Sequence, residues 1–142
     1  MVGPLQSPGA SASIPITKPD NDAKHNACFI KTGAEDIAGH HTDFVVQPFS
    51  DRIFIIVTQL GKMGTMISAE KECAIGGAQS YSVTVLMGKR EVPELELCAR
   101  QVLELIENDG CAKPLLISLA LKDHSIETIK AVIAKVKSLR AW

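Results

Sequence analysis

The segment from Gly61 to Thr65, GKMGT, comes closest of any in the sequence to a phosphate-binding motif. In a phosphate-binding loop, a first glycine precedes the glycine–lysine pair by five residues, a serine or threonine follows the lysine, and a strand leads into a helix. Here Ile56 and Met63 stand at those two positions, and strand-like sequence flanks the segment on both sides. We therefore interpret it as a hairpin turn, in which Gly61 and Gly64 are structural and at least one has a positive φ.

The histidines and cysteines match no metal-binding or nucleophile pattern. His40 and His41 are adjacent, but neighbouring side chains point in different directions from most backbones, and no carboxylates or cysteines surround the pair at ligand spacing. The cysteines at positions 28, 73, 98 and 111 include no C-x-x-C pair, and no serine lies in a G-x-S-x-G motif. The sequence therefore predicts no catalytic residue, no metal ion and no cofactor.

Charge is balanced over the whole chain but not along it. The 142 residues carry 15 basic and 16 acidic side chains, a net charge of −1, so there is no bulk attraction to nucleic acid or to an anionic membrane. Six acidic residues and one basic residue lie in Glu91–Asp109, whereas four basic residues and one acidic residue lie in Ser125–Trp142. These segments can neutralise each other as neighbours, or they can offer two faces to protein partners.

Composition divides the chain into an N-terminal tail and one folded domain. Residues 1–26 hold four of the seven prolines and no periodic apolar pattern, so we expect a disordered tail. Hydrophobic residues make up 46% of the chain and charged residues 22%, which is enough apolar material for one core. We place a single α+β domain at residues 27–142, whose longest apolar runs have the length of strands and not of a membrane span.

The apolar pattern of the domain changes from alternation to helical spacing after residue 91. Strands are expected at Ala27–Thr32, Thr42–Phe49, Arg52–Leu60, Thr65–Ala69, Ser80–Gly88 and Leu115–Leu121. Residues 33–39 and 70–79 have the composition of loops. A helix is expected from Val92 to Asn108, and Ser125 is suited to cap a second one. This order predicts an α+β fold, with a mainly antiparallel sheet of about six strands and two helices packed on one face.

Both faces of the strand at residues 52–60 are apolar. One alternating set is Ile53, Ile55 and Val57, and the other is Phe54, Ile56 and Thr58. A strand with one face in water alternates apolar with polar residues, so both faces of this strand need cover. Because the two helices are expected on one face of the sheet, we expect a second subunit to cover the opposite face. One of the two alternating sets of the strand then forms the dimer face. The alternative is that residues 1–40 fold back over the sheet.

Two segments of the domain combine strands, turns and a helix in a specific order. Ile53–Ala69, IFIIVTQLGKMGTMISA, joins a hydrophobic strand that ends in V-T-Q, the turn G-K-M-G-T and a second strand. Leu119–Lys130, LALKDHSIETIK, joins a strand, the motif K-D-x-S and a helix, and Trp142 follows later. Together these features resemble the proteasome assembly chaperone 3 family, and the resemblance covers roughly residues 27–142.

The resemblance implies a non-catalytic chaperone without a cofactor, built on an antiparallel sheet with two helices. It implies pairing with the related assembly chaperone 4 and a role in building the α-subunit ring of the 20S proteasome, in the cytoplasm and by extension the nucleus. The purified protein is then expected to form a homodimer through the same face. Residues 140–142, Arg-Ala-Trp, differ from the hydrophobic–tyrosine–any ending of other assembly chaperones, so we expect a surface to bind the ring.

The expected loop at residues 70–79 is a candidate part of the partner-binding surface. It contains adjacent glycines and mixed charge between two strands, so we expect it to be mobile in the free protein. Within it, Lys71 and Glu72 are the expected polar contacts of a partner.

Two other functions stay open. The chain can be a small α+β adaptor or scaffold subunit of another complex, which would capture subunits of that complex from a cell extract. It can also be a small hydrolase or ligand-binding domain that uses His40, His41 or a cysteine, which would show a bound metal ion or turnover.

Overall fold

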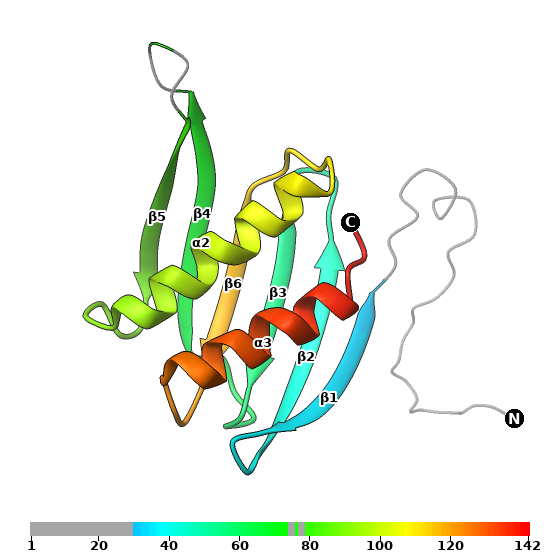
Figure 1. Cartoon of the computed structure of the whole chain (residues 1–142), viewed down its shortest axis with the longest axis vertical. Coiled ribbons are helices and arrows are strands. Elements are labelled where there is room, and N and C mark those ends of the chain that lie inside the picture. Colours follow the sequence, from blue (N-terminus) through cyan, green and yellow to red (C-terminus); the bar gives the residue numbers. More distant parts are fainter. Residues whose placement is uncertain (1–29, 74–75, 77–78) are drawn as a thin grey trace, which may run out of the picture.

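The computed structural model describes residues 30–73, 76 and 79–142, so the predicted tail at residues 1–26 lies outside the described part. Figure 1 shows the strands and helices in their spatial arrangement. In chain order they are β1 (Lys31–Ile37), β2 (His40–Pro48), β3 (Ile53–Thr58), β4 (Thr65–Cys73), β5 (Gln79–Met87), α2 (Pro93–Asn108), β6 (Leu115–Ala120) and α3 (Ile126–Ser138).

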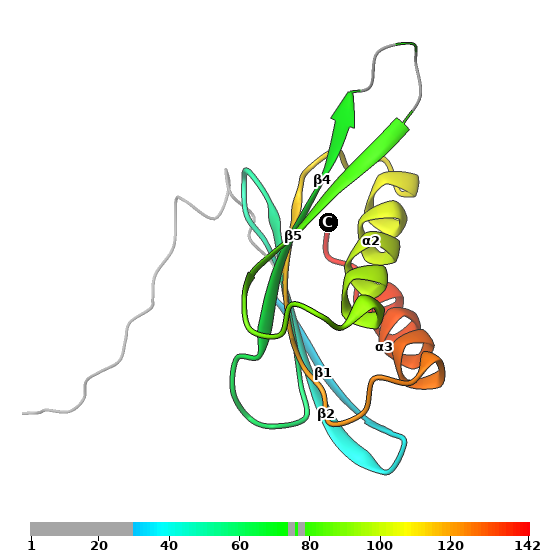
Figure 2. The same ribbon diagram turned by 90° about the vertical axis from the view of Figure 1, so that its left-hand side faces the viewer.

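The strands form one sheet in the order β1-β2-β3-β6-β4-β5. β3 and β6 are parallel, and the other neighbouring strands are antiparallel. α2 and α3 pack against each other on one face of this sheet, and no described element covers the opposite face (Figure 2). The predicted α+β fold, with a mainly antiparallel sheet of six strands and two helices on one face, is confirmed. Pairing of two subunits through the other face stays a prediction.

The connection between β3 and β4 is a crossover and not the predicted hairpin. Because β6 lies between these strands, residues 59–64 pass the end of β6 before β4 begins. β4 then runs antiparallel to β6, with Ile67 opposite Ile117. The sequence predicts a hairpin because two strand-like stretches follow each other closely. A strand from much later in the chain inserts between them instead.

Two segments predicted to be loops contain strands. β1 occupies most of residues 33–39, and the longer β4 and β5 include residues 70–73 and 79. Most side chains of β1 are exposed, as are Glu70, Lys71 and Glu72, so no apolar pattern marks these segments as strands. β1 and residues 70–73 of β4 each pair with one neighbouring strand only. A strand segment with polar residues on both faces cannot be predicted from hydrophobic alternation.

The core lies between the sheet and the helix layer. Its largest fully buried side chains are Phe44, Ile53, Ile55, Ile67, Leu115, Ile117 and Leu119 from the sheet, and Leu95, Leu103, Ile106 and Ile129 from the helices. Pro93 occupies the first turn of α2, and Ser125 caps α3 by accepting a hydrogen bond from the Thr128 N–H. In the described part of the chain, neither helix is long and apolar enough to cross a membrane.

Candidate protein-interaction surface

The open sheet face is the face that no described helix covers. Its side chains alternate with core residues along the strands and include Val45, Phe54, Ile56, Thr58, Met66, Ser68, Leu116 and Ser118. In β3, Ile53, Ile55 and Val57 are completely buried under the helices, whereas the alternate residues are partly exposed. Of the two sets left open by the sequence, only Phe54, Ile56 and Thr58 can therefore meet a second subunit.

The strand register arranges these side chains in two rows across the sheet. One row consists of Gln47, Phe54, Leu116, Ser68 and Thr84. The next row consists of Val45, Ile56, Ser118, Met66 and Met87. Apolar side chains are thus contributed by five adjacent strands, with Phe54, Ile56 and Leu116 at the centre. Val45 and Met66 could not be assigned to this face from the sequence, because only strand order and register bring them to the same patch.

Charged side chains border the open sheet face where β1 and β2 meet. His41 Nε2 lies 3.0 Å from Asp43 Oδ1, and His41 Nδ1 lies 3.9 Å from Asp36 Oδ1. Asp43 is also the register partner of Thr58 in β3. No group of His, Cys, Asp and Glu side chains in the described ranges could hold a metal ion. An apolar centre with a polar border is the arrangement typical of a protein–protein interface.

Gly61 and Gly64 have different roles in the crossover at residues 59–64. Gly61 has a φ of 70°, which favours glycine, and open space surrounds the position of a Cβ atom. A Cβ atom on Gly64 would collide with the carbonyl oxygen of Leu119 and with Ala120. The first glycine thus permits the turn, and the second lets the chain pass close to the backbone of β6.

The amide groups of the crossover are engaged within the protein. Thr58 Oγ1 accepts hydrogen bonds from the N–H groups of Leu60 and Lys62, at 3.1 Å and 3.2 Å. Ser118 Oγ accepts one from the Gly64 N–H at 3.3 Å. A phosphate-binding loop directs its N–H groups at the ligand. This arrangement supports a structural role for the segment.

Lys71 and Glu72 lie on opposite faces of β4. Lys71 Nζ is 3.8 Å from Glu107 Oε2 of α2, and Glu107 Oε1 accepts a hydrogen bond from the Tyr81 hydroxyl at 2.9 Å. Glu72 is exposed and follows Lys71 directly in the strand, so it points away from the helix layer. The structure therefore does not bring the two residues together. The middle of the expected loop, residues 74–75 and 77–78, lies outside the described residues, and its role in partner binding stays a prediction.

The groups with shifted pKa values have structural explanations. The hydroxyls of Ser125 and Thr128 each donate to Asp123 Oδ2 at 2.6 Å and hold the pKa of this carboxyl below its ordinary value. Asp123 thereby joins the first turn of α3, which accounts for the K-D-x-S motif. Burial raises the pKa of the Cys98 thiol to about 12, so the reactive thiolate is not available near neutral pH.

Comparison with known families identifies the group of proteins to which this fold and these motifs belong. The family model described as Proteasome assembly chaperone 3 matches residues 55–139, more than half of the chain. The chain belongs to the proteasome assembly chaperone 3 family. A relative of that name from Nematostella vectensis is 36% identical over 113 residues, which cover 73% of this chain and 83% of the relative. The one from Homo sapiens is 30% identical over 114 residues, which cover 79% of this chain and 93% of the relative.

A solved structure shows the same fold. It is a chain in the crystal structure of a chaperone complex for yeast 20S proteasome assembly, and the superposition has a TM-score of 0.65. The match covers 80% of this chain and 99% of the solved chain, at 17% sequence identity. The resemblance stated from the sequence is thus confirmed at the level of the family, and the architecture at the level of the fold.

Proposed function

We propose that this chain is a non-catalytic chaperone that promotes assembly of the α-subunit ring of the 20S proteasome, as one half of a heterodimer with proteasome assembly chaperone 4. Membership of the assembly chaperone 3 family supports the chaperone function. The solved chain of the same fold belongs to a chaperone complex, which supports a partnership between chaperones. The main support for pairing is that the open sheet face has apolar side chains in both of its rows and is covered by no described helix.

A second subunit on the open sheet face would form a sandwich of two sheets with the helices on the outside. Aligned sheets pack about 10 Å apart and interdigitate the side chains of their inner faces. A specific, stable pair of proteins buries about 1,200–2,000 Å² in total. The two rows span β2, β3, β6, β4 and β5, so the face offers a broad contact with an apolar centre.

The non-catalytic role is supported by what the reactive groups do in the fold. Cys98 is completely buried, and the Asp123 carboxylate accepts hydrogen bonds from two hydroxyls of its own helix start. His41 lies at the surface, with Asp43 and Asp36 on either side of its ring. The same proposal puts the protein in the cytoplasm and by extension the nucleus, which imaging of the tagged full chain tests.

The experiment that tests the function is a capture assay with a matched pair of variants. Ile56 lies at the centre of the open sheet face, whereas Ile126, 44% exposed, lies in the first turn of α3. We expect the unmodified chain to capture assembly chaperone 4 and proteasome α-subunits from a cell extract. Ile56→Asp should abolish capture of assembly chaperone 4, because it places a charge inside the interface. Ile126→Asp should leave capture unchanged, since an acid in a first turn complements the helix dipole.

Three outcomes would contradict the proposal. Undiminished capture of assembly chaperone 4 by Ile56→Asp would show that the open sheet face does not make the contact, once circular dichroism shows that the variant is folded. Capture of the subunits of a different complex would favour the adaptor or scaffold function. Hydrolytic turnover by the purified chain would favour the enzyme.

A further inference from the structure

A pocket of about 300 Å³ opens at the end of the sheet, where β6 ends and the chain crosses from β3 to β4. We call it the crossover pocket. Leu119, Ala120 and Leu121 line it from the end of β6, and Leu60 and Met63 line it from the crossover. Leu60 and Met63 are each 45% exposed, so part of this apolar lining faces solvent. The pocket thus offers a small apolar binding surface at the end of the sheet.

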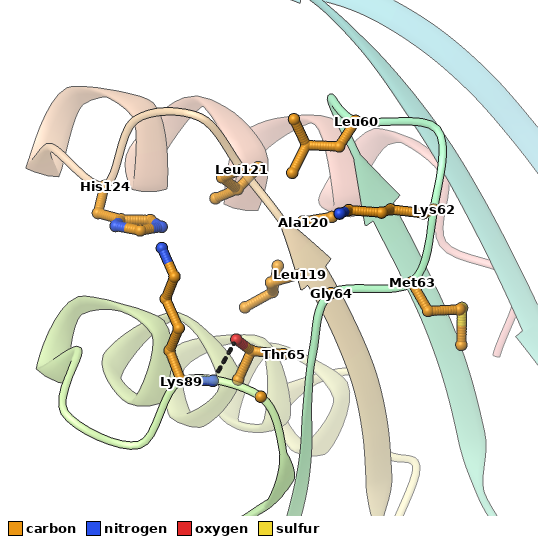
Figure 3. Close-up of a pocket in the computed structure, with 11 residues that line it drawn as sticks. Leu60, Lys62, Met63, Gly64, Thr65, Lys89, Leu119, Ala120, Leu121 and His124 are labelled. Atoms are coloured by element: carbon orange, nitrogen blue, oxygen red, sulfur yellow. Dashed lines mark hydrogen bonds between the residues drawn. The ribbon is translucent and has the colours of Figure 1, made fainter.

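Three basic side chains surround the same pocket. They come from three separate segments: Lys62 from the crossover, Lys89 from the connection after β5, and His124 from the connection before α3. Figure 3 shows the Lys89 side chain extending toward the His124 ring, with Lys62 near Ala120. None of the residues that line the pocket is acidic, and no described carboxylate forms an ion pair with Lys62 or Lys89.

The helix ends add to the positive potential of this region. Both α2 and α3 begin at the end of the sheet where the pocket lies (Figure 1), and helix N-termini carry a partial positive charge. Glu94, Glu96 and Glu127 lie in the first turns of these helices but do not line the pocket. Asp123 is adjacent to His124 in sequence, and its carboxylate, which accepts hydrogen bonds from hydroxyls of α3, stays negatively charged and interacts with the His124 side chain. An anion in the pocket would therefore meet chiefly the side chains of Lys62 and Lys89, which form no ion pair with a described carboxylate.

The backbone argues against a phosphate or nucleotide as the ligand. The Lys62 N–H donates to Thr58 Oγ1, the Gly64 N–H to Ser118 Oγ, and the Lys89 N–H to Thr65 Oγ1 at 3.0 Å. These bonds engage the amide groups that would otherwise cradle phosphate oxygens. The side chains of Lys62, Lys89 and His124 supply further donors above an apolar floor. Such a site suits a carboxylate that is attached to hydrocarbon.

We propose that the crossover pocket binds an acidic segment of a partner protein, in which an aspartate or glutamate follows an aliphatic residue. The aliphatic side chain contacts the floor formed by Leu119, Ala120 and Leu121, and the carboxylate lies between Lys62 and Lys89. The inference rests on the proposed function in taking the occupant to be a protein. The pocket adjoins the open sheet face, because the crossover residues that line it donate hydrogen bonds to Thr58 and Ser118 of that face.

A titration of the full chain, labelled with ¹⁵N, tests the pocket directly. The probe is the capped peptide acetyl-Leu-Glu-Leu-Glu-amide, and the control is acetyl-Leu-Gln-Leu-Gln-amide. We expect saturable shifts of the amide signals of Gly64, Leu121 and His124 with the acidic peptide, and at least tenfold weaker binding of the neutral one. Equal binding of both peptides, or shifts confined to other surfaces, would overturn the proposal. Tighter binding of ATP at the same amides would replace it with a nucleotide site.

Charge variants locate the contact. Lys62→Glu combined with Lys89→Glu should lower the affinity for the acidic peptide at least tenfold, and Lys62→Gln with Lys89→Gln should lower it by a smaller factor. Lys130→Glu combined with Lys137→Glu makes the same charge change on exposed positions of α3 and should leave the affinity unchanged. If both double glutamate variants lowered the peptide affinity equally, binding would depend on the net charge of the protein and not on the crossover pocket, which would overturn the proposal. This assay needs no proteasome component, so its failure is distinguishable from failure of the capture assay.

Discussion

The indole N–H of Trp142 donates a hydrogen bond to Asp109 Oδ2 at 2.9 Å and so connects the segment after α3 to the end of α2. Arg140 Nε lies 3.1 Å from the same carboxylate oxygen, and Lys31 Nζ donates to the Arg140 carbonyl at 2.9 Å. The Trp142 side chain also packs against the core cluster. This segment therefore joins both helices and the edge strand β1, three elements that are distant in sequence.

Substitutions of Trp142 should separate its hydrogen bond from its packing. Trp142→Phe keeps an aromatic ring but removes the donor, and we expect a loss of about 1 kcal/mol in the free energy of unfolding. Trp142→Ala also removes the buried ring surface, and we expect a loss of about 2–3 kcal/mol. Denaturant unfolding followed by circular dichroism measures both values. Equal stability of the two variants would mean that the ring contributes nothing beyond its N–H.

The two glycines of the crossover should respond differently to alanine. Gly61→Ala adds a methyl group in open space but forces a non-glycine residue into a φ of 70°, so we expect a loss of about 1 kcal/mol. Gly64→Ala pushes a Cβ atom into the backbone of β6, so the loss should be larger, about 2–3 kcal/mol. Thermal or denaturant unfolding gives the order. Lys62→Ala serves as the control in the same segment and should unfold like the unmodified chain.

The open sheet face should also control the oligomeric state of the purified chain. We expect multi-angle light scattering at micromolar concentration to show a homodimer, because the apolar side chains at the centre of this face are exposed to water when assembly chaperone 4 is absent. Ile56→Asp should be monomeric, and Ile126→Asp should remain dimeric. A stable monomer of the unmodified chain, with residues 1–26 deleted and folding retained, would contradict this prediction.

Asp123 should make stability depend on pH in the acidic range. Its folded-state pKa lies below the ordinary value of 3.8, because hydroxyls of α3 donate to the carboxylate. Its contribution is therefore complete above the pKa of the unfolded chain and is lost as the pH falls through the folded-state pKa. We expect Asp123→Asn to be less stable than the unmodified chain at neutral pH, and the difference to shrink as the pH falls below about 4. A difference that stays constant down to pH 3 would contradict this assignment.

Local patterns were sufficient for the elements with a buried face. The spacing of Leu95, Cys98, Val102 and Ile106 predicts α2, and all four are buried. Ser125 begins α3 as its residue type predicts. β1 was not predictable in this way, because its side chains are mostly exposed and its pairing with β2 uses backbone groups that every sequence has.

The amino-acid sequence by itself determined the family, the class of fold and the two apolar faces of β3, because these follow from residue types along a continuous stretch. Only the tertiary structure decided that β6 inserts between β3 and β4, since strand pairing depends on contacts across more than 50 residues of chain. That insertion places Phe54 beside Leu116 on the open sheet face and brings Lys62, Lys89 and His124 around one pocket. Hydrophobic periodicity shows which side chains of a strand share a face. Which side chains of the adjacent strands lie beside them depends on strand order and register.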